Sequence, residues 1–115
     1  MSDIHVDRKV LSDLQEIMEG NYLNLLETFL ADSEDRLRQL YKARNAEELG
    51  HAAHSFKGSC SNMGAVGLAE LCRQLEQRIQ QHSLFDIEHL ILQISREFSV
   101  VRQIYRAERE RVLVG

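Results

Sequence analysis

The sequence contains no proline and no tryptophan, and only two of its 115 residues are cysteine. Because proline kinks or ends helices, its absence favours long, uninterrupted helices. Two cysteines fit reduced thiols better than the disulfide framework of a small secreted domain, so we expect a cytoplasmic protein.

Long apolar runs and an excess of basic residues are also missing. No stretch approaches the roughly 18 consecutive apolar residues of a transmembrane helix, and no secretory signal is visible. The net charge of −4 argues against a general nucleic-acid binder, which needs a basic face. We therefore expect neither a membrane nor a nucleic acid as a partner.

Helical periodicity dominates what the sequence does contain. With 115 residues, of which 43% are hydrophobic and 28% charged, the chain suits a single domain over residues 1–115. The spacing of apolar residues predicts helices over about 7–18, 22–44, 46–63, 66–80 and 87–111, the last fraying near its end. We predict an all-α fold, an antiparallel up-down-up-down four-helix bundle with a short N-terminal lead-in helix.

Residues that suit helix ends mark the same boundaries. Polar N-cap residues precede four of the predicted helices, and a glycine follows the third. They are Asp7, Asn21, Asn45 with Glu48 in a capping box, Ser83 with Asp86 in a second box, and Gly64.

The third predicted helix has two chemically distinct faces within the stretch HAAHSFKGSCSNMGA. His54 lies about 140° from the centre of the apolar stripe and should point at solvent, at about 100° per residue. Lys57, Gly58 and Ser61 share its outer face, and His51 is turned further away. The apolar stripe consists of Leu49, Ala52, Ala53, Phe56, Cys60 and Met63.

Gly58 is unexpected inside a helix, where glycine costs about 1 kcal/mol relative to alanine. Its position beside an exposed histidine makes sense if a large group must approach the imidazole. A neutral imidazole is nucleophilic near pH 7, and Lys57 could balance negative charge that arrives there. This combination suits phosphoryl transfer, in which positioning and charge neutralisation supply most of the catalysis.

The run from Ala53 to Ala65 resembles the signature of histidine-containing phosphotransfer (HPt) domains, which reads roughly A-H-x-L-K-G-x-x-x-x-x-G-A. The following residues Leu68, Leu71, Cys72, Leu75 and Glu76 resemble the family's next helix, and residues 29–37 resemble the preceding one. The resemblance covers about residues 20–105. Phe56 replaces the usual leucine, and Asn45-Ala46 replaces a common glycine-aspartate turn; both are structural positions.

The resemblance implies that His54 accepts a phosphoryl group from the aspartyl phosphate of a hybrid sensor kinase's receiver domain. It then passes the group to the aspartate of a response regulator's receiver. Lys57 would balance the phosphoryl charge and Gly58 would give the receiver access. The docking face would comprise His51, Ser55, Lys57, Gly58 and Ser61.

The resemblance also implies a monomer in which Mg²⁺ belongs to the receiver partner and the chain itself holds no cofactor or metal. Asn62, Gly64 and Ala65 would shape the end of the reactive helix. No phosphate-binding glycine loop or ATP-binding sheet is visible, so we expect a carrier and not a kinase.

Other interpretations concern the same residues. A helical adaptor could dock on a receiver or kinase through this face without accepting phosphate, and His51 could replace His54 as the acceptor. His51, His54 and Cys60 could hold zinc, although their spacing suits it poorly. Cys60 and Cys72 are predicted to be small core residues, and Glu76 a surface or capping group.

Overall fold

The computed structural model describes residues 4–83 and 85–115, which form helices joined by short connections. In chain order they are α1 (Arg8–Met18), a 3₁₀ turn η1 (Glu19–Asn21), α2 (Tyr22–Lys42), α3 (Ala46–Asn62), α4 (Val66–Gln80) and α5 (Ile87–Val114). No strand occurs within these described ranges. Among the described helices, none combines the length and the apolar character needed to span a bilayer.

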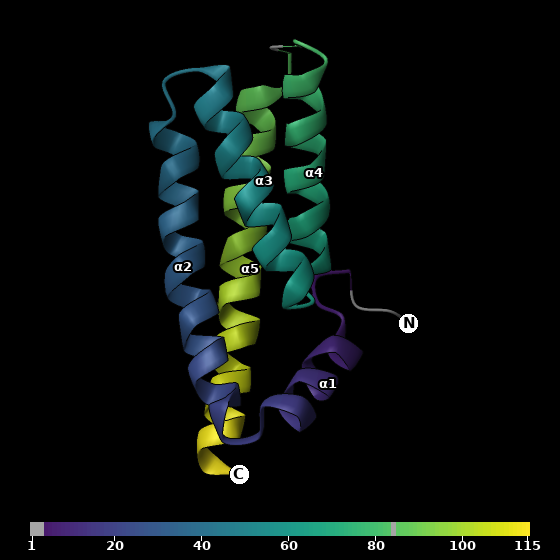
Figure 1. Ribbon diagram of the computed structural model, residues 1–115, viewed down its shortest axis with the longest axis vertical. Helices are drawn as coiled ribbons and strands as arrows, with labels where there is room; N and C mark the ends of the chain where they lie inside the picture. The colour runs from purple at the N-terminus through teal and green to yellow at the C-terminus, as the bar shows by residue number, and fades with distance from the viewer. Residues whose placement is uncertain (1–3, 84) are drawn as a thin grey trace.

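Helices α2 to α5 lie side by side along the long axis of the molecule, and successive helices run in opposite directions (Figure 1). Each packs against two others, in the pairs α2–α3, α3–α4, α4–α5 and α2–α5. Helix α1 lies obliquely near the end of the bundle where α5 finishes (Figure 1). The predicted antiparallel four-helix bundle with a lead-in helix is confirmed.

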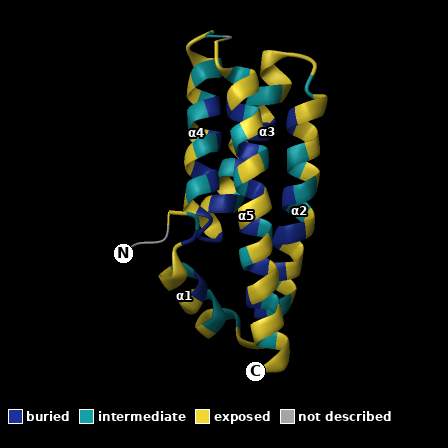
Figure 2. Cartoon of the chain, turned by 180° about the vertical axis from the view of Figure 1, so that it is seen from behind, coloured by how far each residue is buried: buried dark blue, intermediate teal, exposed yellow. Residues whose placement is uncertain are grey.

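Buried residues gather on the faces of the helices that meet, and exposed residues lie outside (Figure 2). Most of the predicted apolar stripes enter this core. Tyr41, which belongs to the apolar spacing that predicts the helix over 22–44, does not enter the core. It is 58% exposed, because it follows the buried Leu40 by one residue and so points about 100° away. Ser33 is buried instead, and its hydroxyl oxygen has no hydrogen-bond partner.

Two of the predicted N-caps form. The Asp7 carboxylate accepts from the backbone N–H of Lys9 at 3.0 Å, and the Asn45 side-chain oxygen accepts from that of Glu48 at 2.8 Å. The Glu48 carboxylate in turn accepts from the N–H of Arg44 at 3.1 Å, which is one residue earlier than in a standard box.

The other two predicted caps are wrong. Asn21 makes no side-chain cap, because η1 leads directly into α2 and its backbone is already helical. Asp86 is the N-cap residue of α5, but it has a φ of 70° and makes no side-chain cap, so the box with Ser83 does not form. Backbone turns replace side-chain caps at both helix starts.

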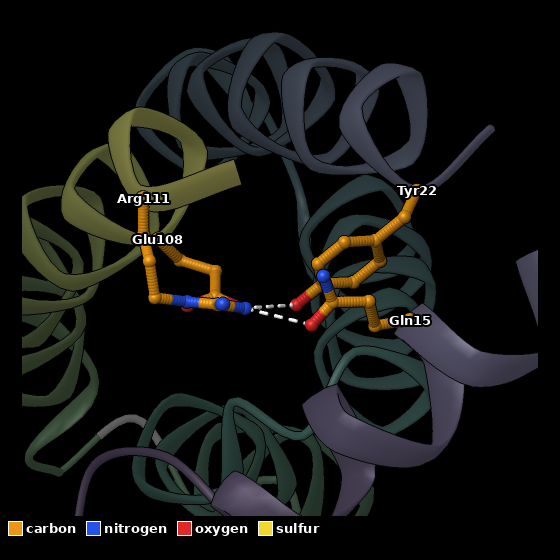
Figure 3. Close-up of polar contacts among 4 residues, drawn as sticks. All are labelled: Gln15, Tyr22, Glu108 and Arg111. Atoms are coloured by element: carbon orange, nitrogen blue, oxygen red, sulfur yellow. Dashed lines mark hydrogen bonds and ion pairs between the residues drawn. The ribbon is translucent and has the colours of Figure 1, made fainter. Parts of the chain in front are cut away.

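The end of α5 is tied to α1 and α2 by a polar network (Figure 3). Arg111 donates to the buried carboxylate of Glu108 and, at 2.7 Å, to Gln15 of α1, and the Tyr22 hydroxyl donates to Glu108 at 2.6 Å. The Arg111 hydrogen bond, opposed by partial burial and assisted by Tyr22, lowers the pKa of Glu108. The predicted fraying near Arg111 is wrong, since these contacts hold α5 helical to Val114.

The turn between α3 and α4 is fixed from two directions. Gly64 ends α3 as predicted, with a φ of 77°, a conformation that suits glycine. Its carbonyl oxygen accepts from the N–H of Asp7 at 2.8 Å, and the buried Tyr105 hydroxyl donates to the carbonyl of Met63 at 2.6 Å. The N-terminal segment and α5 therefore both hold the point at which the chain reverses.

We expect Gly64→Ala to destabilise the fold by about 2 kcal/mol or more. The added Cβ would lie 2.9 Å from the Cβ of Val10, and a non-glycine residue at this φ costs about 1–2 kcal/mol by itself. Denaturant unfolding followed by circular dichroism measures the loss. Gly20→Ala, whose Cβ would meet nothing within 4 Å, serves as the control and should change stability by less than about 0.5 kcal/mol. Equal losses in the two variants would contradict this view of the turn.

Candidate functional site

His54 lies on the outer face of α3 and 70% of its side chain is exposed. Its neighbours Ala53 and Phe56 are fully buried, so one helix presents a packed face and a solvent-exposed face. The predicted phase of the helix is confirmed. The imidazole is thus open to a partner while the backbone that carries it is fixed by the core.

Glu76 of α4 reaches across to two side chains of α3. One carboxylate oxygen lies 2.7 Å from Nδ1 of His54, and the other lies 2.6 Å from Nζ of Lys57. Its side chain is only 15% exposed, so its interpretation as a surface or capping group is wrong. Because His54 and Glu76 lie equally far before and after Ala65, the antiparallel hairpin brings them level.

The contacts of Glu76 determine the tautomer of His54. Partial burial opposes ionisation, but hydrogen bonds from Lys57 and His54 outweigh it and lower the pKa of Glu76. An ionised carboxylate only accepts hydrogen bonds, so Nδ1 of a neutral imidazole must carry the proton. The lone pair of Nε2 is then available as a nucleophile.

Gly58 leaves open space beside the histidine. A Cβ at this position would meet no atom within 4 Å, so packing inside the chain does not require glycine here. Ser61, one turn further, is also exposed. The outer face of α3 beyond His54 therefore presents small side chains.

His51 and Ser55 turn toward the opposite flank of α3. Together with Gln39 and Lys42 they line a shallow groove of about 340 Å³ between α2 and α3. His54 and Lys57 instead face α4 through Glu76. The predicted docking residues thus form two neighbouring surfaces, separated by the crest of α3.

Cys60 and Cys72 are both free and fully buried, as predicted. Burial, assisted by nearby Glu76 and opposed by Lys57, raises the pKa of the Cys72 thiol to about 12, and burial likewise raises that of Cys60. Cys60 faces the core while His54 faces solvent, so the two do not form a common metal site. Within residues 4–83 and 85–115, no cluster of three or more histidine, cysteine or acidic side chains could hold a metal ion.

Comparison with known proteins places this site in a family. Residues 24–104 match the Hpt domain, from near the start of α2 to a point ten residues before the end of α5. The chain belongs to the histidine-containing phosphotransfer (HPt) family. Members of this family are phosphotransfer carriers in phosphorelays, and they interact with receiver domains.

A solved structure agrees closely with this HPt chain. It is the crystal structure of histidine-containing phosphotransfer protein B (HptB) from Pseudomonas aeruginosa PAO1, with 49% sequence identity and a TM-score of 0.92. The alignment covers 96% of this chain and 98% of that one. Among curated protein sequences, none matches significantly. The resemblance inferred from the residues around His54 is confirmed at the level of the family.

We expect Gly58→Ala to stabilise the HPt fold by about 1 kcal/mol, the difference between alanine and glycine in a helix interior. The open space at this position lets the new methyl group enter without a clash. Gly50→Ala in the same helix is the matched comparison, since its Cβ would make an ordinary contact at 3.7 Å with Ile79. Chemical denaturation of both variants measures the gains. A loss of stability in Gly58→Ala alone would show that glycine serves the fold at this position.

Proposed function

We propose that His54 is the phosphoacceptor of a cytoplasmic phosphorelay and that the reacting atom is Nε2. The donor is the aspartyl phosphate of a hybrid sensor kinase's receiver domain, and the final acceptor is the aspartate of a response regulator's receiver. The observation that carries this proposal is the exposed imidazole whose Nδ1 is held by the Glu76 carboxylate.

The transfer is a substitution at phosphorus. The Nε2 lone pair forms the N–P bond while the P–O bond to the donor aspartate breaks and its carboxylate departs. The ring gains positive charge as this bond forms, and Glu76 stabilises that charge through the Nδ1–H. In the second transfer, the acceptor's carboxylate attacks phosphorus and the electron pair of the N–P bond returns to Nε2.

The surrounding residues have separate roles in this proposal. Lys57 balances charge on the phosphoryl oxygens, and Gly58 lets the receiver approach the ring. His51, Ser55 and Ser61 contribute to docking on either side of these two residues. Mg²⁺ belongs to the receiver, and the chain acts as a monomeric carrier without ATP-dependent kinase activity of its own.

We expect His54→Gln to abolish labelling of the protein by a phosphorylated receiver domain, because glutamine offers no nucleophilic ring nitrogen. His51→Gln is the matched control and should be labelled like the wild type. The measurement is transfer of radiolabelled phosphate from each purified receiver domain of the source organism, followed by acid treatment, to which phosphohistidine is labile.

Two other results would contradict the assignment. Labelling lost in His51→Gln but kept in His54→Gln would move the acceptor by one turn. Binding of receivers to the wild type without any acid-labile phosphate would identify a non-catalytic adaptor.

We expect Gly58→Glu to remain folded but to slow phosphotransfer by about tenfold or more, because it places bulk and negative charge beside an incoming phosphoryl group. Gly20→Glu adds the same side chain at a distant position with nothing within 4 Å, and should transfer normally. Transfer reactions quenched at a series of times under single-turnover conditions give the rates of both variants. Equal rates in the two variants would remove the proposed role of Gly58 in access.

A further inference from the structure

We propose that Lys57 exchanges partners during the reaction, and that Glu76 is the positioning residue that holds Lys57 beside His54 until the phosphoryl group arrives. In the resting protein Lys57 pairs with Glu76. In the phosphorylated protein it pairs with the phosphoryl oxygens. This inference rests on the proposed phosphorylation of His54 and assigns a role to Glu76 that the HPt motif around His54 does not specify.

The resting contacts limit what Lys57 can do before the phosphoryl group arrives. Its Nζ lies 2.6 Å from a carboxylate oxygen of Glu76, and its side chain is only 30% exposed. Its positive charge is therefore already balanced. For Lys57 to neutralise a phosphoryl group, it must weaken or leave the contact with Glu76.

The geometry of the site means that the Lys57 ammonium group needs to move only a short way to change partners. His54 and Lys57 are three residues apart on α3, a spacing that places side chains side by side on a helix. They also contact the two oxygens of the same carboxylate. Because the lysine side chain is a flexible four-carbon stem, its ammonium group can move from that carboxylate to a group bonded to Nε2 of the adjacent ring.

Charge balance gives the exchange its direction. A phosphoryl group brings about two negative charges near neutral pH, and formation of the N–P bond leaves positive charge on a ring that keeps its Nδ1 proton. Glu76 can then pair with that ring through the existing 2.7 Å contact, which frees Lys57 for the phosphoryl oxygens. Each cation and anion of the site has a partner both before and after transfer.

The exchange also explains why the Glu76 side chain is largely buried between the helices while that of His54 is exposed. The carboxylate must hold both side chains before transfer and the charged ring after it, without attracting the partner's own cations. The Glu76 side chain contacts α3, and because it is only 15% exposed it presents little negative charge at the surface. The exposed ring and the mobile lysine meet the phosphoryl group.

The test uses protein phosphorylated on histidine by phosphoramidate, a small donor that needs no receiver, and follows the phosphoryl group by ³¹P NMR as a function of pH. We expect Lys57→Gln to raise the pKa of the phosphoryl group, because a paired cation favours its dianionic form. Glu76→Gln should lower that pKa, because it removes a nearby negative charge and leaves Lys57 on the phosphoryl oxygens. Circular dichroism verifies that each variant is folded.

Glu70→Gln is the matched control on the same helix. Hydrogen bonds from Arg73 lower the pKa of Glu70 to about 2, so this variant also removes one ionised, ion-paired carboxylate from α4, but away from His54. It should leave the phosphoryl pKa at the wild-type value. The transfer rate from a receiver should fall about tenfold in Glu76→Gln, through lost stabilisation of the charged ring, and stay unchanged in Glu70→Gln.

Failure of this inference is distinguishable from failure of the proposed function. A wild-type phosphoryl pKa in Lys57→Gln would show that Lys57 stays with Glu76, and would overturn the exchange while leaving His54 as the acceptor. Absence of phosphohistidine at residue 54 with both phosphoramidate and charged receivers would overturn the proposed function itself.

Discussion

A single carboxylate, that of Glu76, joins the two helices that form the site. Both of its oxygens are used, one by the imidazole of His54 and the other by the ammonium of Lys57. A hydrogen bond at these distances tolerates displacements of only a few tenths of an ångström. The chemistry of the outer face therefore depends on the register of α3 against α4, and much of the remaining structure serves to fix that register.

The register of α3 against α4 is set at the turn between them and is maintained by contacts from the N-terminal segment and α5. Gly64 lets the chain reverse in a compact left-handed conformation, and the backbone N–H of Asp7 binds its carbonyl oxygen. Tyr105 of α5 reaches the neighbouring carbonyl of Met63 through the core. The network around Glu108 then ties the end of α5 to α1 and α2 (Figure 3). The lead-in helix and the far end of α5 thus support a site that neither of them touches.

The helices and the exposure of His54 were predictable because they depend on local periodicity. A residue 140° from an apolar stripe points to solvent whatever the tertiary detail, and Gly64 ends a helix for a conformational reason that sequence alone reveals. The caps at Asn21 and Asp86 were not predictable in this way, since backbone turns replaced them. Ser33 entered the core although its side chain is polar, because its helical phase left it no other direction.

The contacts of Glu76 with His54 and Lys57 were not predicted, because they join two helices and the periodicity of a single helix carries no information about contacts between helices. The information was nevertheless present in the sequence. Once a hairpin is centred on Ala65, counting outward pairs His54 with Glu76, and an acidic residue level with a histidine and a lysine identifies a common partner. Pairing predicted antiparallel helices across their turn is therefore the step that single-helix periodicity lacks.

In the function that we propose, the division between buried and exposed groups separates the chemistry of transfer from the docking of a receiver. Glu76, beneath the surface, controls the tautomer of the ring and the position of Lys57. The surfaces that we propose for receiver docking, along Gly58 and Ser61 and in the groove beside His51 and Ser55, carry none of these contacts. Side chains in the groove beside His51 and Ser55 can therefore change without altering the contacts of Glu76. At Gly58, in the proposed function, added bulk or negative charge would instead reach the incoming phosphoryl group. The function that we propose needs this independence, because two different receivers would have to reach the same nitrogen atom.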